Sequence, residues 1–462
     1  MARPDAVIVG SGPNGLTAAA RLAVSGQKVL VLEAAGAIGG GTRSLELTRP
    51  GFIHDVCSAI HPFGVISPAY RALSVPIDWI TPPVAMSHPL DDGTAVALHN
   101  SLEATAAQFG DRDGKEWAGL IGPLEADLDN VVETFLAARI LPNPFSRAAR
   151  IMGIHGSRSS AALADRFDSD PARALIAGLA AHAIAPLDTA FTAGIALLFA
   201  AVGNGRGWPL VRGGSQGLAS ALAGIIRDRD GQIEVNREVA DINEFAGSSV
   251  FLDVNPSAAR EMARQRMNPA DIVMLGRWKP GPGVFKIDYA LDGPIPWTDS
   301  LSGHAGTVHL GGGFEEIAEA EAAVAGGDHV QRPFVIVTQQ SDFDPLRAPA
   351  GKRTGWAYCH VPNGSNVDMT SAIEGQIERF APGFTERIIA RHATTAEGME
   401  RYNPNYVGGD IAGGEFTPGR FLPSVKNPYR VGDGLYLCSS ATPPGGGTHG
   451  MCGWNAATAS LS

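Results

Sequence analysis

The most informative residues lie near the N-terminus, where glycines at a fixed spacing follow an apolar segment. Residues 6–9 predict a buried strand that runs into Gly10, Gly12 and Gly15. Gly10 permits a tight turn, Gly12 lets the backbone approach a pyrophosphate, and Gly15 lets the next helix pack closely on the strand. The N-terminus of that helix favours negative charge. This spacing predicts a dinucleotide-binding site.

A second glycine turn follows the next predicted strand. Residues 28–32 predict a strand that ends in Glu33, whose carboxylate we expect on the ribose hydroxyls. Gly40 and Gly41 then offer backbone amides to a phosphate, and Arg43 adds a charge-assisted hydrogen bond. An ordinary loop would explain these glycines, but not their register with Glu33. The run resembles the acid-x4-hydrophobic-Gly-Gly extension of amine oxidases, phytoene desaturases and related FAD enzymes, which implies that the dinucleotide is FAD.

The C-terminal segment supplies the other half of the predicted site. Residues 434–442 predict a strand, residues 443–451 are rich in glycine, and Asn455 begins a predicted helix. Glycines let the backbone pass close to a flat ring, and a helix N-terminus stabilises negative charge at its edge. The segment resembles the closing FAD motif of the same enzymes, and residues 234–242 resemble their adenine-contacting strand. The cofactor-binding residues we expect are Gly10, Gly12, Pro13, Asn14, Gly15, Glu33, Ala34, Gly40, Gly41, Thr42, Arg43, Val239, Ser440, Gly446, Gly450, Met451 and Asn455.

Proton transfer during a redox reaction needs an acid or a base, and His61 is the leading catalytic candidate. It lies in residues 52–63, a segment that in relatives leads toward the substrate side of the flavin. The competing interpretation makes His61 a satisfied polar group at a strand end. His449, inside the closing motif, is expected to contact the cofactor.

Composition excludes several classes of function. A net charge of -11 argues against nucleic-acid binding, which needs clustered Lys and Arg. Four cysteines without C-x-x-C spacing suggest neither a metal site nor a thiol-disulfide centre, and reduced thiols predict a cytoplasmic protein. The first strand starts too early for a signal peptide. Residues 191–202 are the most apolar stretch, yet shorter than the ~20 residues that span a bilayer. Peripheral membrane contact and the oligomeric state stay open.

Because the glycine motifs stand at both ends of the chain, the predicted FAD-binding domain is discontinuous. We expect an α/β fold with a Rossmann-like FAD-binding domain and a substrate domain that combines a mixed sheet with a helical lid. Residues 284–291 predict a half-buried strand, and the glutamates from Glu315 to Glu321 predict the solvated side of a helix. The expected boundaries are residues 1–100, 210–265 and 425–462 for the FAD-binding domain, with residues 101–209 and 266–424 for the substrate domain.

Three further segments, residues 285–294, 341–349 and 402–410, complete a resemblance to a known family. With the two glycine motifs they resemble the phytoene desaturase-like flavoproteins, most of all the branch called pyridine nucleotide-disulfide oxidoreductase domain-containing protein 2. The resemblance spans nearly the whole chain and is thinnest across residues 110–180. It implies FAD, the two-domain architecture of p-hydroxybenzoate hydroxylase and amine oxidases, and redox chemistry on an apolar substrate.

Despite the name of that branch, the sequence argues against thiol-disulfide chemistry, because no cysteine pair has redox spacing. Outside the C-terminal motif, no second GxGxxG follows a predicted strand, so a dedicated NAD(P)H domain is disfavoured and reoxidation by oxygen or a quinone is expected. The leading hypothesis is an FAD-dependent dehydrogenase, desaturase or isomerase that transfers hydride from a hydrophobic, polyene-like small molecule to flavin N5. One alternative is a flavin amine oxidase, for which no aromatic cage can be named. The other is a non-catalytic FAD-binding scaffold.

Overall fold

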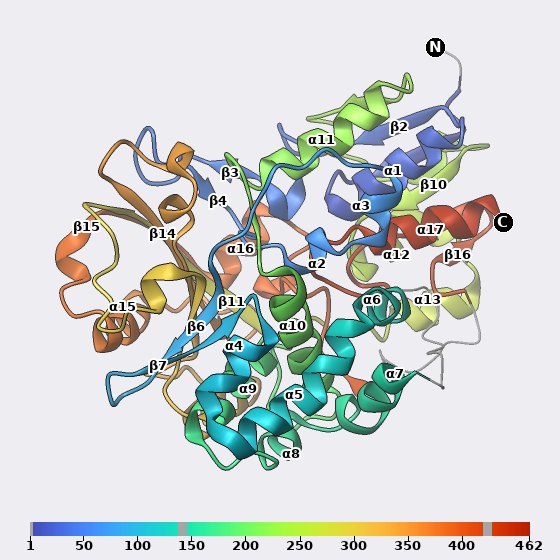
Figure 1. Ribbon diagram of the computed structural model, residues 1–462. Helices are drawn as coiled ribbons and strands as arrows, with labels where there is room; N and C mark the ends of the chain where they lie inside the picture. The colour runs from blue at the N-terminus through green and yellow to red at the C-terminus, as the bar shows by residue number, and fades with distance from the viewer. Residues whose placement is uncertain (1–2, 137–145, 419–426) are drawn as a thin grey trace.

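The computed structural model describes residues 3–136, 146–418 and 427–462 and contains two large β-sheets (Figure 1). The six-stranded sheet has the order β16-β17-β10-β1-β2-β9, and its strands come from three distant stretches of chain. Its strands are β1 (Ala6–Val9), β2 (Val29–Leu32), β9 (Gln232–Glu234), β10 (Ser249–Leu252), β16 (Arg430–Gly432) and β17 (Leu435–Leu437). The expected α/β class, with a Rossmann-like domain and a mixed-sheet domain, is confirmed.

The centre of the six-stranded sheet is parallel, since β1 pairs in register with β10 on one side and β2 on the other. The carboxyl ends of these three strands therefore lie at one edge, where α/β sheets bind ligands. Helix α1 (Pro13–Val24) packs against α11 (Gln216–Arg227) and against the C-terminal helix α17 (Met451–Leu461). The two ends of the chain are thus side by side (Figure 1).

The seven-stranded sheet, of order β15-β11-β14-β13-β12-β6-β7, forms the second lobe of the molecule (Figure 1). One of its faces is apolar and packs on α15 (Thr370–Phe380). Every residue of β11 is buried because β11 lies inside the sheet between β14 and β15, so the expectation of a half-buried strand is wrong. The strands are β6 (Val84–Pro89), β7 (Ala95–His99), β11 (Gly283–Leu291), β12 (Ala305–Leu310), β13 (Val335–Thr338), β14 (Arg353–Val361) and β15 (Ile388–Thr394).

Two expected domain boundaries differ from the structure. Strands β6 and β7 precede residue 100 but belong to the seven-stranded sheet, because β6 pairs in parallel with β12. Helix α13 (Pro269–Leu275) follows residue 265 but packs, through Leu275, in the core of the six-stranded sheet. Both errors have one cause: these contacts join segments far apart in sequence, which local patterns do not specify.

A layer of helices occupies the lower part of the molecule in Figure 1. The longest is α5 (Gly110–Ala126), and the apolar segment at residues 191–202 falls in α10 (Thr192–Arg206), which is buried nearly all round. No helix within residues 3–136, 146–418 and 427–462 is long and apolar enough to cross a membrane. The other helices of this layer are α4 (Leu102–Ala106), α6 (Leu128–Leu136), α7 (Arg147–Ile151), the π-helical turn η3 (Met152–Gly156), α8 (Ser160–Ala164) and α9 (Asp170–Ala181).

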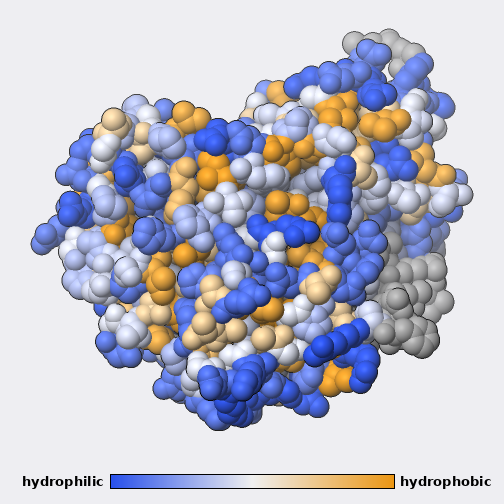
Figure 2. All heavy atoms as spheres, viewed as in Figure 1, coloured by the Kyte–Doolittle hydropathy of each residue, from blue (hydrophilic) through white to orange (hydrophobic). Residues whose placement is uncertain are grey.

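Shorter elements connect the lobes, and polar side chains cover most of the periphery in Figure 2, with apolar groups scattered between them. The shorter connecting elements are β3 (Ser44–Leu45), β4 (His54–Asp55), α2 (Pro62–Val65), α3 (Pro68–Ala72), β5 (Trp79–Ile80), β8 (Leu210–Val211), α12 (Pro256–Ala263), α14 (Phe314–Ala325) and α16 (Ala396–Tyr402).

In helix α14, Glu315 is exposed as expected, but Glu321 is buried beside the His360 imidazole. The expectation that these glutamates are all solvated is therefore wrong.

Candidate cofactor and substrate site

The turn from β1 to α1 lies at the carboxyl edge of the six-stranded sheet, as the glycine spacing predicts. Gly10 has φ +99°, a conformation that favours glycine. A Cβ at Gly12 would lie 2.7 Å from Oδ2 of Asp253, and one at Gly15 would collide with the carbonyl oxygen of Gly10. The glycines are therefore required by packing within the protein, while the approach of Gly12 to a pyrophosphate stays a prediction.

Asp253, at the end of β10, is a residue that sequence reasoning missed. Its Oδ2 accepts a hydrogen bond of 2.9 Å from the N–H of Gly15, within the first turn of α1. Burial raises the pKa of this carboxyl to about 7, although the N–H groups of Gly15 and Gly12 act against the rise. The feature of the sequence that could have identified Asp253 is its position as an acidic residue directly after the strand Ser249–Leu252.

Glu33 lies at the carboxyl end of β2, beside the glycine turn, where a ribose-binding acid is expected. Its carboxylate accepts hydrogen bonds from the Ser11 N–H at 3.0 Å and from the Ala35 N–H at 2.9 Å. Nη2 of Arg43 lies 3.2 Å from Oε1 of the same group. Arg43 thus neutralises Glu33 in this structure, and its expected contact with a phosphate stays a prediction.

The second glycine turn packs directly on the first. A Cβ at Gly40 would lie 3.1 Å from the Cα of Gly12, and one at Gly41 would collide with the Tyr406 hydroxyl. Tyr402 donates a hydrogen bond of 2.9 Å to the carbonyl oxygen of Gly40. Both tyrosines come from the segment that follows β15, so the C-terminal half of the chain closes over this turn.

The closing motif reaches the start of α1, as the resemblance implies. Gly450 has φ +68° at the N-cap of α17, and a Cβ at Gly453 would collide with the carbonyl oxygen of Asn14. Other members of the motif bond within the protein: His449 Nδ1 accepts from the Met451 N–H, and Asn455 donates to the Tyr429 hydroxyl. Ser440 and Gly446 lie in the loop between β17 and α17.

Val239 is buried in the core of the six-stranded sheet with Val9 and Leu32. The strand that was expected over residues 234–242 is shorter, because β9 ends at Glu234 and the chain then turns at Asn236, which has φ +55°. Val239 still lies at the carboxyl edge of β1 and β2, where the adenine end of a dinucleotide is expected.

The residues at this edge fit a dinucleotide. Asn14, in the first turn of α1, has a buried Oδ1 with no hydrogen-bond partner among the described residues. Two glycine turns with their backbone amides meet beside it, and Glu33 stands at the end of the neighbouring strand. The Asn14 oxygen, the backbone amides of the glycine turns and the Glu33 carboxylate together supply hydrogen-bond donors and acceptors of the kind that a pyrophosphate and a ribose need.

His61, the sequence candidate for proton transfer, is fully buried at the N-cap of α2. Its Nε2 lies 2.9 Å from the hydroxyl of Ser215, which in turn donates to the carbonyl oxygen of Ser58 at 2.7 Å. Burial lowers the pKa of His61 to about 4. These contacts favour the interpretation of His61 as a satisfied polar group, and its catalytic role stays a prediction.

A buried ion network beside His61 joins three segments of the chain. Nη1 of Arg347 lies 2.8 Å from Oδ2 of Asp55, and its Nε lies 3.0 Å from Oδ2 of Asp344. All three side chains are fully buried. Burial alone would raise the pKa of Asp55, but Arg347 and the Ser215 N–H lower it. The network fixes β4 and β8 against the loop after β13.

One face of the seven-stranded sheet is polar and aromatic, and we call it the polar face. Buried Lys286 pairs with Asp288, and its Nζ lies 5.6 Å from the Trp356 ring centroid. Burial raises the pKa of Cys57 while Lys286 lowers it, so Lys286 is within electrostatic reach of a residue that borders Gly41. The polar face comprises His88, Lys286, Asp288, Thr307, His309, Thr338, Trp356, Tyr358 and His360.

His182, just after α9, contacts this face and was also missed. Its Nε2 lies 3.1 Å from Nε2 of His309, and its ring stacks on Phe199 with centroids 4.4 Å apart. Burial lowers the pKa of His182 to about 3, yet the residue is only half-buried, whereas His61 is fully buried. His182 is therefore better placed than His61 to exchange a proton with a bound molecule.

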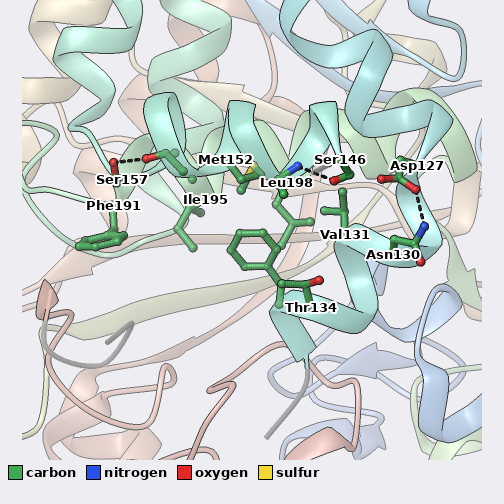
Figure 3. A pocket seen from close by; sticks show the side chains of 15 residues that line it. Asp127, Asn130, Val131, Thr134, Ser146, Met152, Ser157, Phe191, Ile195 and Leu198 are labelled. Carbon is green, nitrogen blue, oxygen red and sulfur yellow. Dashed lines mark hydrogen bonds between the residues drawn. The ribbon is translucent and has the colours of Figure 1, made fainter. Parts of the chain in front are cut away.

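A cavity of about 170 Å³ opens among the helices of the lower layer (Figure 3). Val131, Met152, Ile195 and Leu198 line it, with Asp127 and Asn130 together at one end. A cavity of this size and character accommodates a small apolar group. Leu198 precedes Phe199, whose ring packs on Phe63 with centroids 4.6 Å apart, so α10 connects this cavity to the residues around the closing motif.

Comparisons with known proteins agree with this geometry. Residues 8–73 match the family described as NAD(P)-binding Rossmann-like domain. The chain is 26% identical to pyridine nucleotide-disulfide oxidoreductase domain-containing protein 2 of Mus musculus, over 98% of this chain and 92% of the relative. It is 25% identical to the neurosporene-forming phytoene desaturase of Rhodobacter capsulatus, over 52% of this chain and 51% of that protein.

Two solved structures share the fold over almost their whole length. An oxidoreductase from Methanosarcina mazei superposes with a TM-score of 0.68 at 17% identity, covering 99% of each chain. A putrescine oxidase variant superposes with a TM-score of 0.64 at 16% identity, covering 99% of this chain and 97% of that one. The chain therefore shares its fold with this oxidoreductase and with putrescine oxidase. The resemblance to the phytoene desaturase-like FAD oxidoreductases is confirmed, with homology to the branch that includes the mouse protein.

Proposed function

We propose that this chain binds FAD and oxidises or isomerises a hydrophobic small molecule. The observation that carries the proposal is the meeting of both ends of the chain at one sheet edge, where the β1–α1 turn, Glu33 and helix α17 converge. When bound, FAD supplies the redox chemistry by accepting a hydride at N5. Homology to a phytoene desaturase supports an apolar, polyene-like substrate.

Each part of the cofactor has residues that would hold it. The N-terminus of α1 and the two glycine turns would bind the pyrophosphate, with Arg43 released from Glu33 to add positive charge. Glu33 would bind the ribose, and Val239 would pack on the adenine. The flavin would lie against the closing motif at Ser440, Gly446, Gly450, Met451 and Asn455, which stay predicted contacts.

The residues of this chain orient the substrate and handle protons. The polar face and α10 supply a buried wall, and burial strengthens the electrostatic interactions within it. Lys286 pairs with Asp288 on the polar face, and His182 is a half-buried residue that contacts the same face. Proton transfer to or from the substrate would use these groups or, as the sequence suggests, His61.

The first experiment is cofactor identification. We expect the purified protein to be yellow with the two absorption bands of oxidised flavin, and the apoprotein to bind FAD in preference to FMN and NAD. Glu33→Gln should weaken FAD binding by about tenfold, since it removes one charged acceptor. Glu238→Gln, an exposed carboxylate on the same sheet edge, is the matched control. A colourless protein that binds no added FAD contradicts the proposal.

The electron acceptor is tested in a stopped-flow instrument. The second match to the dinucleotide spacing, Gly445, Gly447 and Gly450, belongs to the closing motif expected at the flavin, so no separate NAD(P)H domain is expected. We therefore expect slow flavin reduction by NADPH and fast reoxidation of the photoreduced protein by oxygen or a quinone. Rapid reduction by NADPH contradicts this part of the proposal.

An amine oxidase is the second candidate, favoured by the fold of putrescine oxidase. Tyr402 and Tyr406 beside the second glycine turn, with Trp356 on the polar face, supply aromatic surface for an amine. Release of hydrogen peroxide on addition of putrescine or cyclohexylamine supports this candidate. A protein that holds FAD but turns over neither amines nor a panel of terpenes and polyenes is the non-catalytic scaffold.

A further inference from the structure

Three neighbouring strands carry a row of buried polar atoms on the polar face. Thr307 of β12 is directly opposite Thr338 of β13, which is directly opposite Trp356 of β14. Their exposed fractions are 2%, 1% and 6%. Among the described residues, neither threonine Oγ1 nor the Trp356 Nε1 has a hydrogen-bond partner.

Such a row of polar atoms destabilises the folded protein unless another group forms hydrogen bonds with it. A buried polar group without a partner destabilises a protein by about 1–3 kcal/mol, and most buried polar groups are paired. The sheet does not need polar residues here, because the adjacent positions on the opposite face are Val308, Val337 and Ala357. Valine has nearly the shape of threonine, so packing alone favours valine at these positions.

The row lies on the side of the sheet that faces the predicted cofactor. Trp356 packs beside Lys286 and Tyr358, and Oδ1 of Asp288 on the same face lies 3.6 Å from Nδ1 of His54. His54 precedes Cys57, which borders Gly41, by three residues. The apolar side chains of Met86 and Ile336 also come from this face of the sheet. A molecule bound here would therefore be mainly apolar with a polar group at the row.

We propose that this row binds an oxygen atom of the substrate, which is an apolar molecule bearing a carbonyl or hydroxyl group and not a plain hydrocarbon. The inference rests on the proposed function, because it names the substrate class of the same site. The Trp356 N–H donates to the oxygen, and the hydroxyls of Thr307 and Thr338 donate or accept. All three groups are neutral, so the site selects an uncharged oxygen over a carboxylate or phosphate.

The binding test uses two probes that share one carbon skeleton, the hydrocarbon limonene and its ketone carvone. Both are volatile, so gas chromatography of the headspace over the FAD-loaded protein gives the free concentration of each. We expect carvone to bind about tenfold more tightly than limonene, which corresponds to one to two hydrogen bonds. The pair of substitutions Thr338→Val and Trp356→Phe should bring the two affinities within about twofold. Equal binding of both probes by the natural protein overturns the proposal.

A stability comparison tests the same row without a ligand. Since Thr307 and Thr338 have no protein partner, Thr307→Val with Thr338→Val should leave Tm unchanged or raise it by up to about 4 °C. The control is Thr105→Val. Thr105 Oγ1 accepts hydrogen bonds from the His99 N–H and from the Asn204 side chain, so this substitution should lower Tm. The proposal is overturned if the row variant loses as much Tm as the control. Where neither probe binds the protein, this Tm comparison decides whether the proposal stands. Flavin absorbance of every variant separates loss of the row from loss of the cofactor.

Discussion

Arg347→Met removes the cation that holds two buried carboxylates. Arg347 bonds Asp55 at 2.8 Å and Asp344 at 3.0 Å, and its third nitrogen donates to the carbonyl oxygen of Val211 at 3.0 Å. Methionine retains much of the volume but none of these bonds. The N–H groups of Gly213 and Leu346 still donate to Asp344 and the Ser215 N–H still donates to Asp55, so both carboxylates keep backbone donors but lose their charge partner.

The magnitude follows from the burial of the network. Breaking a fully buried ion pair by removing one partner costs about 3–5 kcal/mol, because an uncompensated charge remains. An unfolding entropy of about 2.1 cal/mol/K per residue over a chain of 462 residues gives roughly 1 kcal/mol/K. We therefore expect Arg347→Met to lower Tm by about 3–5 °C.

The assay is thermal unfolding followed by differential scanning fluorimetry, with Arg401→Met as the control. Arg401 pairs with Glu397 at an exposed site, where an ion pair contributes little, so its loss should shift Tm by less than about 1 °C. The pKa of Asp55 is lowered in the folded protein, so its contribution is present at neutral pH and lost as pH falls through the folded value. If Arg347→Met and Arg401→Met shift Tm equally at neutral pH, the buried-network reasoning is refuted.

Three other predictions concern contacts that the structure revealed. Gly453→Ala should lower Tm and weaken FAD binding, because its Cβ collides with Asn14; the measurements are fluorimetry and FAD titration. The pKa of Asp253 is raised to about 7 in the folded protein, so protonated Asp253 stabilises the folded protein at low pH, and this stabilisation is lost as pH rises toward 7. In Asp253→Asn this group no longer titrates, so Tm should change less between pH 5 and about pH 8 than in the natural protein. Glu321→Leu should lower Tm by about 1–3 °C because it leaves His360 unpaired, whereas an equal effect of Glu319→Leu would contradict the assigned burial.

Local motifs were predictable because each depends on a few adjacent residues. The β1–α1 turn needs Gly10 at positive φ and small residues where the chain passes close to itself, so the glycine spacing records that geometry in the sequence. The buried helix over residues 191–202 and the strand over residues 284–291 were predicted for the same reason, since their apolar runs are continuous. The burial of that strand was underestimated because its two neighbours lie far away in sequence.

Of the candidate site, the sequence indicated only the residues of the expected cofactor half, and their contacts with a cofactor stay predictions. Glu33 and Arg43 stand beside glycine turns and so carry a signal, whereas Asp253 reaches the same turn from the end of β10. His182 gave no signal, because a histidine after an apolar helix is common, and only its contact with His309 distinguishes it. His61 had the clearer sequence context and proved to be fully buried and hydrogen-bonded.

The sequence by itself determined the two glycine turns, the acid at the end of β2 and the apolar strands and helices, because backbone sterics and hydrophobic periodicity act over a few residues. Only the tertiary structure decided which lobe takes β6 and β7, that Arg347 joins Asp55 to Asp344, and that Thr307, Thr338 and Trp356 form one row. Those relations join side chains from strands and loops distant in the chain. Their energies arise from burial and pairing that exist only once the sheets have assembled.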